Sequence, residues 1–220
     1  MNINEEGFIY SAYLLNDKNN IYIITSNFSS KGYYTDPIKL FDLKGKKIKE
    51  IKDSYYQTYY IDVYYDNKVS KKYIISGNVG YCTSYDYYEN KIYHNYLDKN
   101  SHKAQHSELM ININDKITKL IESSIDGYIR IWDFNSGELL NKILVSTKWI
   151  FGFCLWNIDY ILVGCFDKTI KIVDIKNSKV INELKGHNRE VINIKKINLP
   201  NFGECLISNG SYQEQIKIWR

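Results

Sequence analysis

The sequence contains few of the residues that promote or break helices. Alanine occurs only at Ala12 and Ala104, and two prolines are present in 220 residues. Alanine is the best helix former, whereas isoleucine, valine and the 21 tyrosines favour strands. No ten-residue segment keeps apolar side chains at helical spacing. The composition therefore favours an all-β protein.

The chain also lacks long apolar runs, a strong charge excess and cysteine pairs at metal-site spacing. No stretch approaches the roughly 18 consecutive apolar residues of a membrane-spanning helix, and residues 1–6 are too polar for a secretory signal. The net charge of +4 is too small by itself to indicate nucleic-acid binding. No two of the four cysteines have the spacing of a zinc or redox motif. We therefore expect buried, reduced thiols in an intracellular protein.

An internal repeat is the most informative feature that is present. A short apolar strand recurs five times, with its final positions spaced by 44, 47, 41 and 46 residues. Those final positions are Asp42, Asp86, Asp133, Asp174 and Arg220. The near-constant period predicts five copies of one unit, at residues 7–52, 55–97, 104–145, 147–185 and 187–220.

Each unit is expected to hold four short strands joined by tight turns. In the fourth unit the expected strands are 149–155, 160–165, 169–174 and 179–184. The third unit repeats this order at 108–113, 117–122, 128–132 and 139–144. Four such strands form one antiparallel meander sheet per unit.

The period, the strand order and the terminal motif resemble the WD-repeat family of β-propellers. That family has Gly-His near the start of a unit and Trp-Asp at the end of its third strand. Here Gly186-His187 opens the fifth unit and Trp132-Asp133 ends the third strand of the third. The resemblance implies an all-β fold, a propeller of five four-stranded antiparallel blades in a single domain over residues 1–220. The family mostly closes with seven blades, so we expect an incomplete or open ring, completed by missing blades or by a partner chain.

The resemblance also implies a structural hydrogen-bond network in each blade. In the family it joins a histidine, an aspartate of the turn after the second strand, a second-strand hydroxyl and the third-strand tryptophan. No unit here supplies all four, and Glu122 stands at the hydroxyl position of the third unit. The candidates for this clamp are His106, Asp126, Trp132, Asp133, Asp167, Asp174, His187, Ser208 and Trp219.

Loops on a rigid scaffold are the usual places for recognition. The repeat frame places six candidate partner-binding residues just after the histidine position or the turn aspartate: Tyr128, Lys148, Trp149, Lys168, Asn188 and Arg189. Arginine, tryptophan and tyrosine are enriched at interface hot spots. Trp149 has an alternative interpretation as the first core residue of its strand.

The lysine-rich segment 44–52 has two interpretations. Lysines on an outer edge strand protect it from pairing with other chains. A basic patch would instead bind nucleic acid or acidic lipid. The modest net charge favours the edge strand.

No pattern in the chain combines a nucleophile with a base, and His102 and His106 lack a third metal ligand. We therefore expect no enzyme activity, no catalytic residue, no metal and no cofactor. The resemblance implies a cytoplasmic or nuclear scaffold that binds proteins or peptides through its top-face loops and central channel, and not nucleic acid. A propeller enzyme or lectin would need paired carboxylates or a metal cluster. A third hypothesis is a regulatory or substrate-recruiting module of a larger enzyme, such as a kinase or a ubiquitin ligase.

Overall fold

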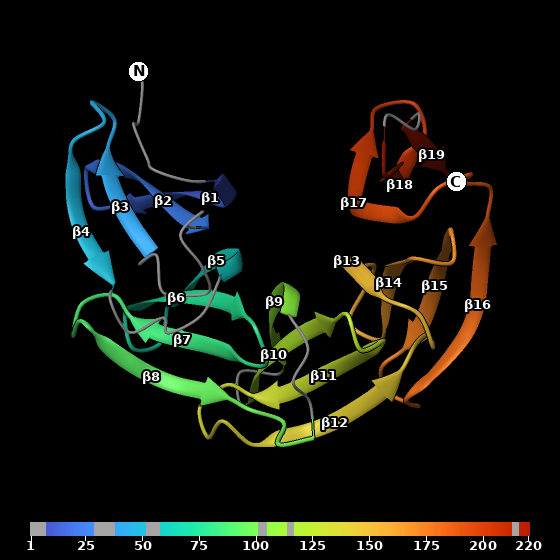
Figure 1. Cartoon of the computed structure of the whole chain (residues 1–220), viewed down its shortest axis with the longest axis horizontal. Coiled ribbons are helices and arrows are strands. Elements are labelled where there is room, and N and C mark those ends of the chain that lie inside the picture. Colours follow the sequence, from blue (N-terminus) through green and yellow to red (C-terminus); the bar gives the residue numbers. More distant parts are fainter. Residues whose placement is uncertain (1–7, 29–37, 52–57, 101–104, 114–116, 213–215) are drawn as a thin grey trace. The chain divides into compact units, whose positions relative to one another are not determined.

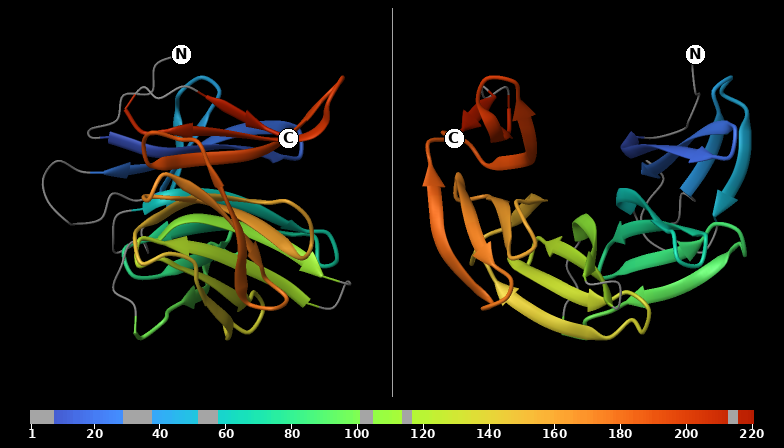
Figure 2. Two further views of the ribbon diagram at one scale, coloured as in Figure 1. Left: turned by 90° about the vertical axis from the view of Figure 1, so that its right-hand side faces the viewer. Right: turned by 180° about the vertical axis from the view of Figure 1, so that it is seen from behind.

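The structure is a computed structural model, and it describes residues 8–28, 38–51, 58–100, 105–113, 117–212 and 216–220. These residues form strands β1 to β19 and no helix (Figures 1 and 2). Within each sheet the strands follow one another in chain order and pair antiparallel, which confirms the all-β meander prediction. The chain divides into two compact units, residues 1–108 and 109–220, and each is described by itself.

The first unit contains two four-stranded sheets, called blades 1 and 2. Blade 1 consists of β1 (Phe8–Asp17), β2 (Asn20–Phe28), β3 (Ile38–Asp42) and β4 (Lys47–Ile51). Blade 2 consists of β5 (Thr58–Asp66), β6 (Lys71–Asn78), β7 (Cys82–Asp86) and β8 (Lys91–Tyr96).

The second unit contains blades 3, 4 and 5. Blade 3 begins with β9 (Gln105–Ile113), which crosses the unit boundary, and continues with β10 (Ile117–Ser124), β11 (Tyr128–Asp133) and β12 (Leu139–Leu144). Blade 4 consists of β13 (Ile150–Leu155), β14 (Tyr160–Cys165), β15 (Thr169–Asp174) and β16 (Lys179–Lys185). Blade 5 has three strands, β17 (Val191–Leu199), β18 (Gly203–Gly210) and β19 (Lys217–Trp219). Closure into one ring and a single domain over the whole chain stay predictions.

The repeated aspartate at the end of the third strand has a local structural cause. Asp133 Oδ1 accepts hydrogen bonds from the amides of Asn135 and Ser136, at 2.9 and 2.8 Å. Asp174 Oδ1 accepts one from the amide of Asn177 at 2.8 Å. Asp42 and Asp86 bind the amides of their own turns in the same way. The register of the third and fourth strands also shifts near this turn in blades 1 to 4. A short carboxylate thus satisfies turn amides that the sheet leaves without partners.

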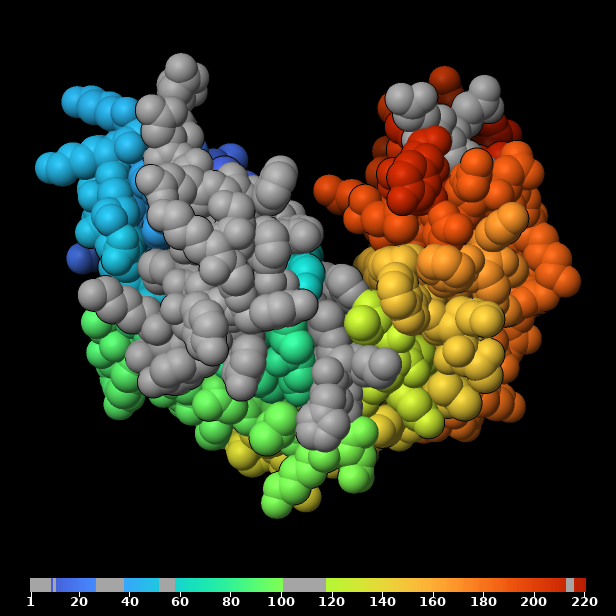
Figure 3. All heavy atoms as spheres, viewed as in Figure 1, coloured from blue at the N-terminus to red at the C-terminus, as the bar shows by residue number. Residues whose placement is uncertain are grey.

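The apolar core of each unit lies between neighbouring blades. In the first unit Leu15, Ile24 and Leu40 of blade 1 pack with Ile61 and Ile74 of blade 2. The second unit has a corresponding cluster between blades 3 and 4, which includes Ile121, Ile131, Phe153, Val163 and Val173. In Figure 3 the side chains of these two blades, coloured yellow-green to orange, meet along the visible face of the second unit. In both pairs, a blade therefore buries apolar side chains against its neighbour.

Lysine side chains also join neighbouring blades within a unit. Lys72 Nζ donates to the carbonyl oxygen of Asn16 at 2.7 Å, and Lys196 Nζ donates to that of Trp156 at 2.8 Å. Lys196 lies over the Trp156 ring, at 4.9 Å from the centroid. A long apolar stem packed on an aromatic ring with its ammonium on a carbonyl satisfies both parts of the side chain.

Two lysines of the lysine-rich segment 44–52 lie in different environments. It includes β4, the outermost strand of blade 1, where Lys47 is exposed and pairs with Glu50. Lys49, in contrast, is half-buried and donates to the carbonyl oxygen of Tyr87 at 3.1 Å. Burial lowers the pKa of Lys49, and the nearby Asp86 opposes that shift. One residue of the run thus connects blades 1 and 2, and Lys52 lies outside the described residues.

Candidate functional site

Blade 5 contains a compact polar network made of three of the candidate clamp residues. Trp219 Nε1 donates to Ser208 Oγ at 2.7 Å, and His187 Nε2 lies 2.7 Å from the same oxygen. Because Ser208 Oγ accepts from tryptophan, its single proton is free to go to His187 Nε2. His187 and Ser208 are buried. The network therefore ties the loop before β17 to β18 and β19; its expected acidic member falls at residues 213–214, outside the described part of the chain.

Blade 3 replaces this neutral network by buried charges. Glu122 on β10 stands directly across from Arg130 on β11, and both side chains are fully buried. Arg130 Nη1 lies 3.7 Å from Glu122 Oε1, and Nη2 pairs with Asp126 Oδ2. Asp126 also accepts from the amide of Tyr128 at 3.1 Å. The turn aspartate is therefore engaged with an arginine that sequence reasoning did not identify.

Blade 3 contains two further candidates for the clamp, Trp132 and His106. Trp132 packs in the interior with only 2% of its surface exposed. His106 lies on β9, and its side chain is outside the described part of the structure. Only blade 5 thus brings a histidine, a hydroxyl and a tryptophan together in the described residues.

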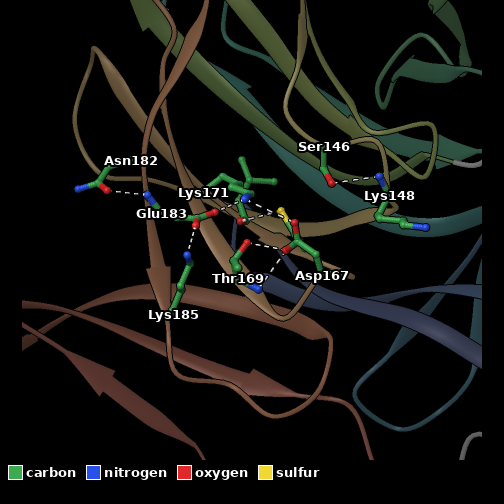
Figure 4. A network of polar contacts seen from close by, with 10 residues as sticks. Ser146, Lys148, Asp167, Thr169, Lys171, Asn182, Glu183 and Lys185 are labelled. Atoms are coloured by element: carbon green, nitrogen blue, oxygen red, sulfur yellow. Dashed lines mark hydrogen bonds and ion pairs between the residues drawn. The ribbon is translucent and has the colours of Figure 1, made fainter.

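In blade 4 the turn aspartate is part of an exposed network (Figure 4). Asp167 Oδ1 accepts from the amide of Thr169 at 3.1 Å, and Asp167 Oδ2 lies 3.4 Å from Lys171 Nζ. Lys171 also pairs with Glu183, which in turn pairs with Lys185 at 2.7 Å. Hydrogen bonds from these two lysines lower the pKa of Glu183 to about 2. Val173 takes the tryptophan position and packs in the core.

An exposed group of aromatic side chains lies at the start of blade 4. Trp149 is 51% exposed and Phe166 is 41% exposed, and their rings are 5.6 Å apart in an edge-to-face arrangement. Phe151 is half-buried and stands 6.5 Å from both rings. The amide of Phe166 donates to the carbonyl oxygen of Trp149 at 2.9 Å, which holds the two residues side by side. We call Trp149, Phe151 and Phe166 the aromatic cluster.

The aromatic cluster decides between the two interpretations of Trp149. The Trp149 ring lies on the surface, so Trp149 is not the first core residue here. The first buried residue is Ile150, at the start of β13. Phe151 and Phe166 were missed from sequence. Phe151 stands two positions after Trp149. Phe166 is hydrogen-bonded to Trp149 just beyond the paired ends of β13 and β14, so residue spacing and strand register were the available signals.

The other candidate binding residues border this cluster in different ways. Lys148 and Lys168 are exposed, and Lys168 has a φ of 71° in the turn after β14. Asn188 and Arg189 are exposed on the loop before β17. Tyr128 is half-buried, with Lys142 Nζ 4.4 Å from its ring centroid, so it is the least accessible of the six.

Close backbone packing brings these loops together. A side chain at Gly127, where φ is +87°, would overlap the carbonyl oxygen of Ser146 and approach that of Lys148. Likewise a Cβ at Gly164 would lie 2.7 Å from the carbonyl oxygen of Val191. Glycine at these two positions therefore places the turn of blade 3 beside residue 148, and β14 beside the start of β17.

The described residues contain no group of three or more histidine, cysteine or acidic side chains placed to hold a metal ion. Burial raises the pKa of the Cys154 thiol to about 11 and that of Cys165 to about 12. Neither thiol is therefore a thiolate nucleophile at neutral pH. Within the described ranges, no helix has the length and apolar character needed to cross a membrane.

Comparisons with known proteins give partial sequence matches and matches to solved structures. A U3 small nucleolar RNA-associated protein 21 homolog of Schizosaccharomyces pombe is 29% identical over 100 residues, which are 46% of this chain and 11% of that protein. A WD repeat domain-containing protein 83 homolog of Dictyostelium discoideum is 31% identical over 104 residues, which are 46% of this chain and 30% of that protein. No family model matches the chain.

The structural match concerns the fold alone. The crystal structure of the computationally designed Ika4 protein aligns with a TM-score of 0.53 and 19% identity, over 67% of this chain and 84% of that one. The matched segments span less than a third of either curated relative, so those proteins extend well beyond the part they share with this chain.

Proposed function

Because this chain is a WD-repeat β-propeller protein, we propose that it is a non-catalytic scaffold that binds other proteins or peptides through the aromatic cluster of blade 4. The observation that carries the proposal is the exposure of Trp149 and Phe166 where β13 begins and β14 ends. Large aromatic side chains with little conformational freedom are typical anchors of protein interfaces. Exposed next to each other, they form an apolar patch that a partner can cover.

The flanking residues complete the proposed surface. Lys148, Lys168, Asn188 and Arg189 are exposed and supply polar contacts around the apolar centre, which is the usual anatomy of a protein interface. We assign Tyr128 a supporting role, because it is half-buried beside Lys142. The clamp residues of blades 3 and 5 are assigned to stability and not to binding.

The experiment that tests the proposal compares two exposed aromatic residues. Partners are captured in cells by proximity labelling with the wild-type chain, and each is then purified and titrated calorimetrically. Trp149→Ala is expected to lower the affinity at least about tenfold, as a hot-spot residue does. Phe202→Ala is the matched control, since Phe202 is 53% exposed in the turn between β17 and β18, away from the aromatic cluster. Equal affinities for wild type and Trp149→Ala with every purified partner would contradict the proposal.

A second proposal is that the chain acts as a regulatory or substrate-recruiting module of a larger protein, such as a kinase or a ubiquitin ligase. The supporting observation is that the matched segments are only 11% and 30% of the curated relatives. Sequencing of full-length transcripts tests this idea, and a coding region confined to these repeats would exclude it.

We further propose a nuclear or cytoplasmic location. One relative is named for its association with a small nucleolar RNA, and this name favours the nucleus. Fluorescence microscopy of the tagged chain, with a secreted protein as the reference, provides the test. A signal in the secretory pathway would overturn the assignment.

A further inference from the structure

Positive charge surrounds the aromatic cluster. Lys148 directly precedes Trp149, and Lys168 follows Phe166 by two positions. Both lysines are exposed, and Figure 4 shows the Lys148 side chain extending away from its backbone contact with Ser146. Arg189 is exposed on the loop that leads into β17, whose first residues pack against β13 and β14. Cations thus accompany the apolar surface on three separate loops.

The acidic side chains of the same loops are engaged within the protein. Asp167 binds Thr169 and Lys171, Glu190 accepts from the Ser211 hydroxyl, and Asp126 pairs with Arg130. The Ser211 hydrogen bond, with Arg189 and Lys168 nearby, lowers the pKa of Glu190. These carboxylates are therefore engaged within the protein, whereas no described carboxylate forms an ion pair with Lys148 or Lys168 within 4 Å.

We propose that the segment recognised by this surface is an acidic peptide that carries one aromatic or aliphatic anchor. This inference rests on the proposed function and names the chemistry of its partner. The anchor covers Trp149 and Phe166, while the acidic side chains pair with Lys148, Lys168 and Arg189. Charge complementarity of this kind sets register and partner choice more than affinity, which the apolar contact supplies.

RNA is a less suitable occupant of the same surface. Proteins bind single-stranded RNA by stacking its bases on the open faces of aromatic side chains. A groove lined with cations follows the RNA backbone. Here the rings meet edge to face, with interplanar angles of 64° and 84° around Trp149. The surface therefore favours isolated carboxylates next to an apolar group.

A selection experiment tests the inference without a known partner. A random-peptide phage library is panned on the whole chain, and the enriched peptides are synthesised and titrated by fluorescence anisotropy. A random single-stranded RNA pool is selected in parallel. The variants are Trp149→Ala, the double variant Lys148→Gln/Lys168→Gln, and the control Lys176→Gln/Lys179→Gln. The control removes the same charge from the opposite end of blade 4, at the turn between β15 and β16.

We expect enriched peptides with several acidic residues around one apolar residue. Trp149→Ala should lower the affinity for these peptides at least about tenfold, and Lys148→Gln/Lys168→Gln should lower it about three- to tenfold. The control variant should bind them with unchanged affinity. Raising the salt concentration from about 0.05 to 0.5 M should weaken binding to the wild type and have less effect on the double variant. Peptides that depend on Trp149 but carry no acidic excess would overturn this inference and leave the proposed function intact. Selection of RNA that outcompetes the peptides would overturn the inference as well, and a library with no enriched peptide would overturn both.

Discussion

Blades 3 and 5 fill the clamp positions of the repeat with different chemistry. In blade 5 one hydroxyl, Ser208, links His187 to Trp219. In blade 3 the second-strand position is Glu122, and a buried arginine joins it to the turn aspartate. Trp132 is buried, whereas Trp219 is only partly buried. The same repeat frame therefore accommodates a neutral network in blade 5 and a charged network in blade 3.

The largest expected effect concerns the tryptophan of blade 3. Trp132→Ala should lower the free energy of unfolding by about 3–5 kcal/mol, because it removes a buried aromatic side chain from the core. Trp149→Ala is the matched control, and it should stay within about 0.5 kcal/mol because that ring is on the surface. Chemical denaturation followed by circular dichroism measures both. Similar midpoints for the two variants would contradict the assigned burial.

The next effect separates the charged network from the neutral one. Arg130→Met should cost about 3 kcal/mol, since it leaves Glu122 buried without its cation. The double variant Arg130→Met/Glu122→Leu should recover most of this loss, because apolar groups often replace a buried ion pair without a net cost. The same denaturation experiment applies. A double variant less stable than Arg130→Met would show that the pair itself stabilises blade 3.

In blade 5 a smaller loss is expected. Ser208→Ala removes the oxygen that bonds both His187 and Trp219, so it should lower the free energy of unfolding by about 1–3 kcal/mol. Ser178→Ala is the control, because its hydroxyl makes only an exposed contact with Asn141. A Ser208→Ala variant as stable as this control would show that the hydrogen bonds of Ser208 with His187 and Trp219 do not stabilise blade 5.

Substitution in the exposed network of blade 4 should change the pKa of Glu183 more than the free energy of unfolding. Glu183 is held near a pKa of about 2, below the ordinary value of 4.5, chiefly by its hydrogen bond with Lys171. The stabilisation that this carboxylate provides is thus present above about pH 4.5 and is lost as the pH falls towards 2. Lys171→Met should raise the pKa of Glu183, which carboxyl carbon NMR titration can follow. An unchanged pKa would show that Lys185 alone holds the charge.

Much of the fold follows from local patterns. The predicted strands 160–165 and 169–174 coincide with β14 and β15, because alternating apolar residues and turn residues are read from neighbouring positions. The repeated aspartates likewise act within their own turns. Features confined to one hairpin are therefore accessible from sequence.

Side-chain placement across strands was harder to predict. Trp149 directly precedes β13, and its place in the sequence is compatible with either burial or exposure until the register of β13 with β14 is known. The burial of Arg130 depends on Glu122 across the sheet and Asp126 in the turn, a combination that the family motif does not contain. Such pairs depend on three-dimensional compensation of charge, which periodicity does not encode.

The meander order of the blades has a consequence for how the chain folds. Since each strand pairs with the next one along the chain, the hairpins close short loops and need little search. Contacts between blades, such as that of Lys72 with Asn16, close much longer loops. We therefore expect amides within a hairpin to gain protection in pulsed hydrogen exchange before contacts between blades, such as that of Lys72 with Asn16, are made. In this order the blades form first and dock afterwards.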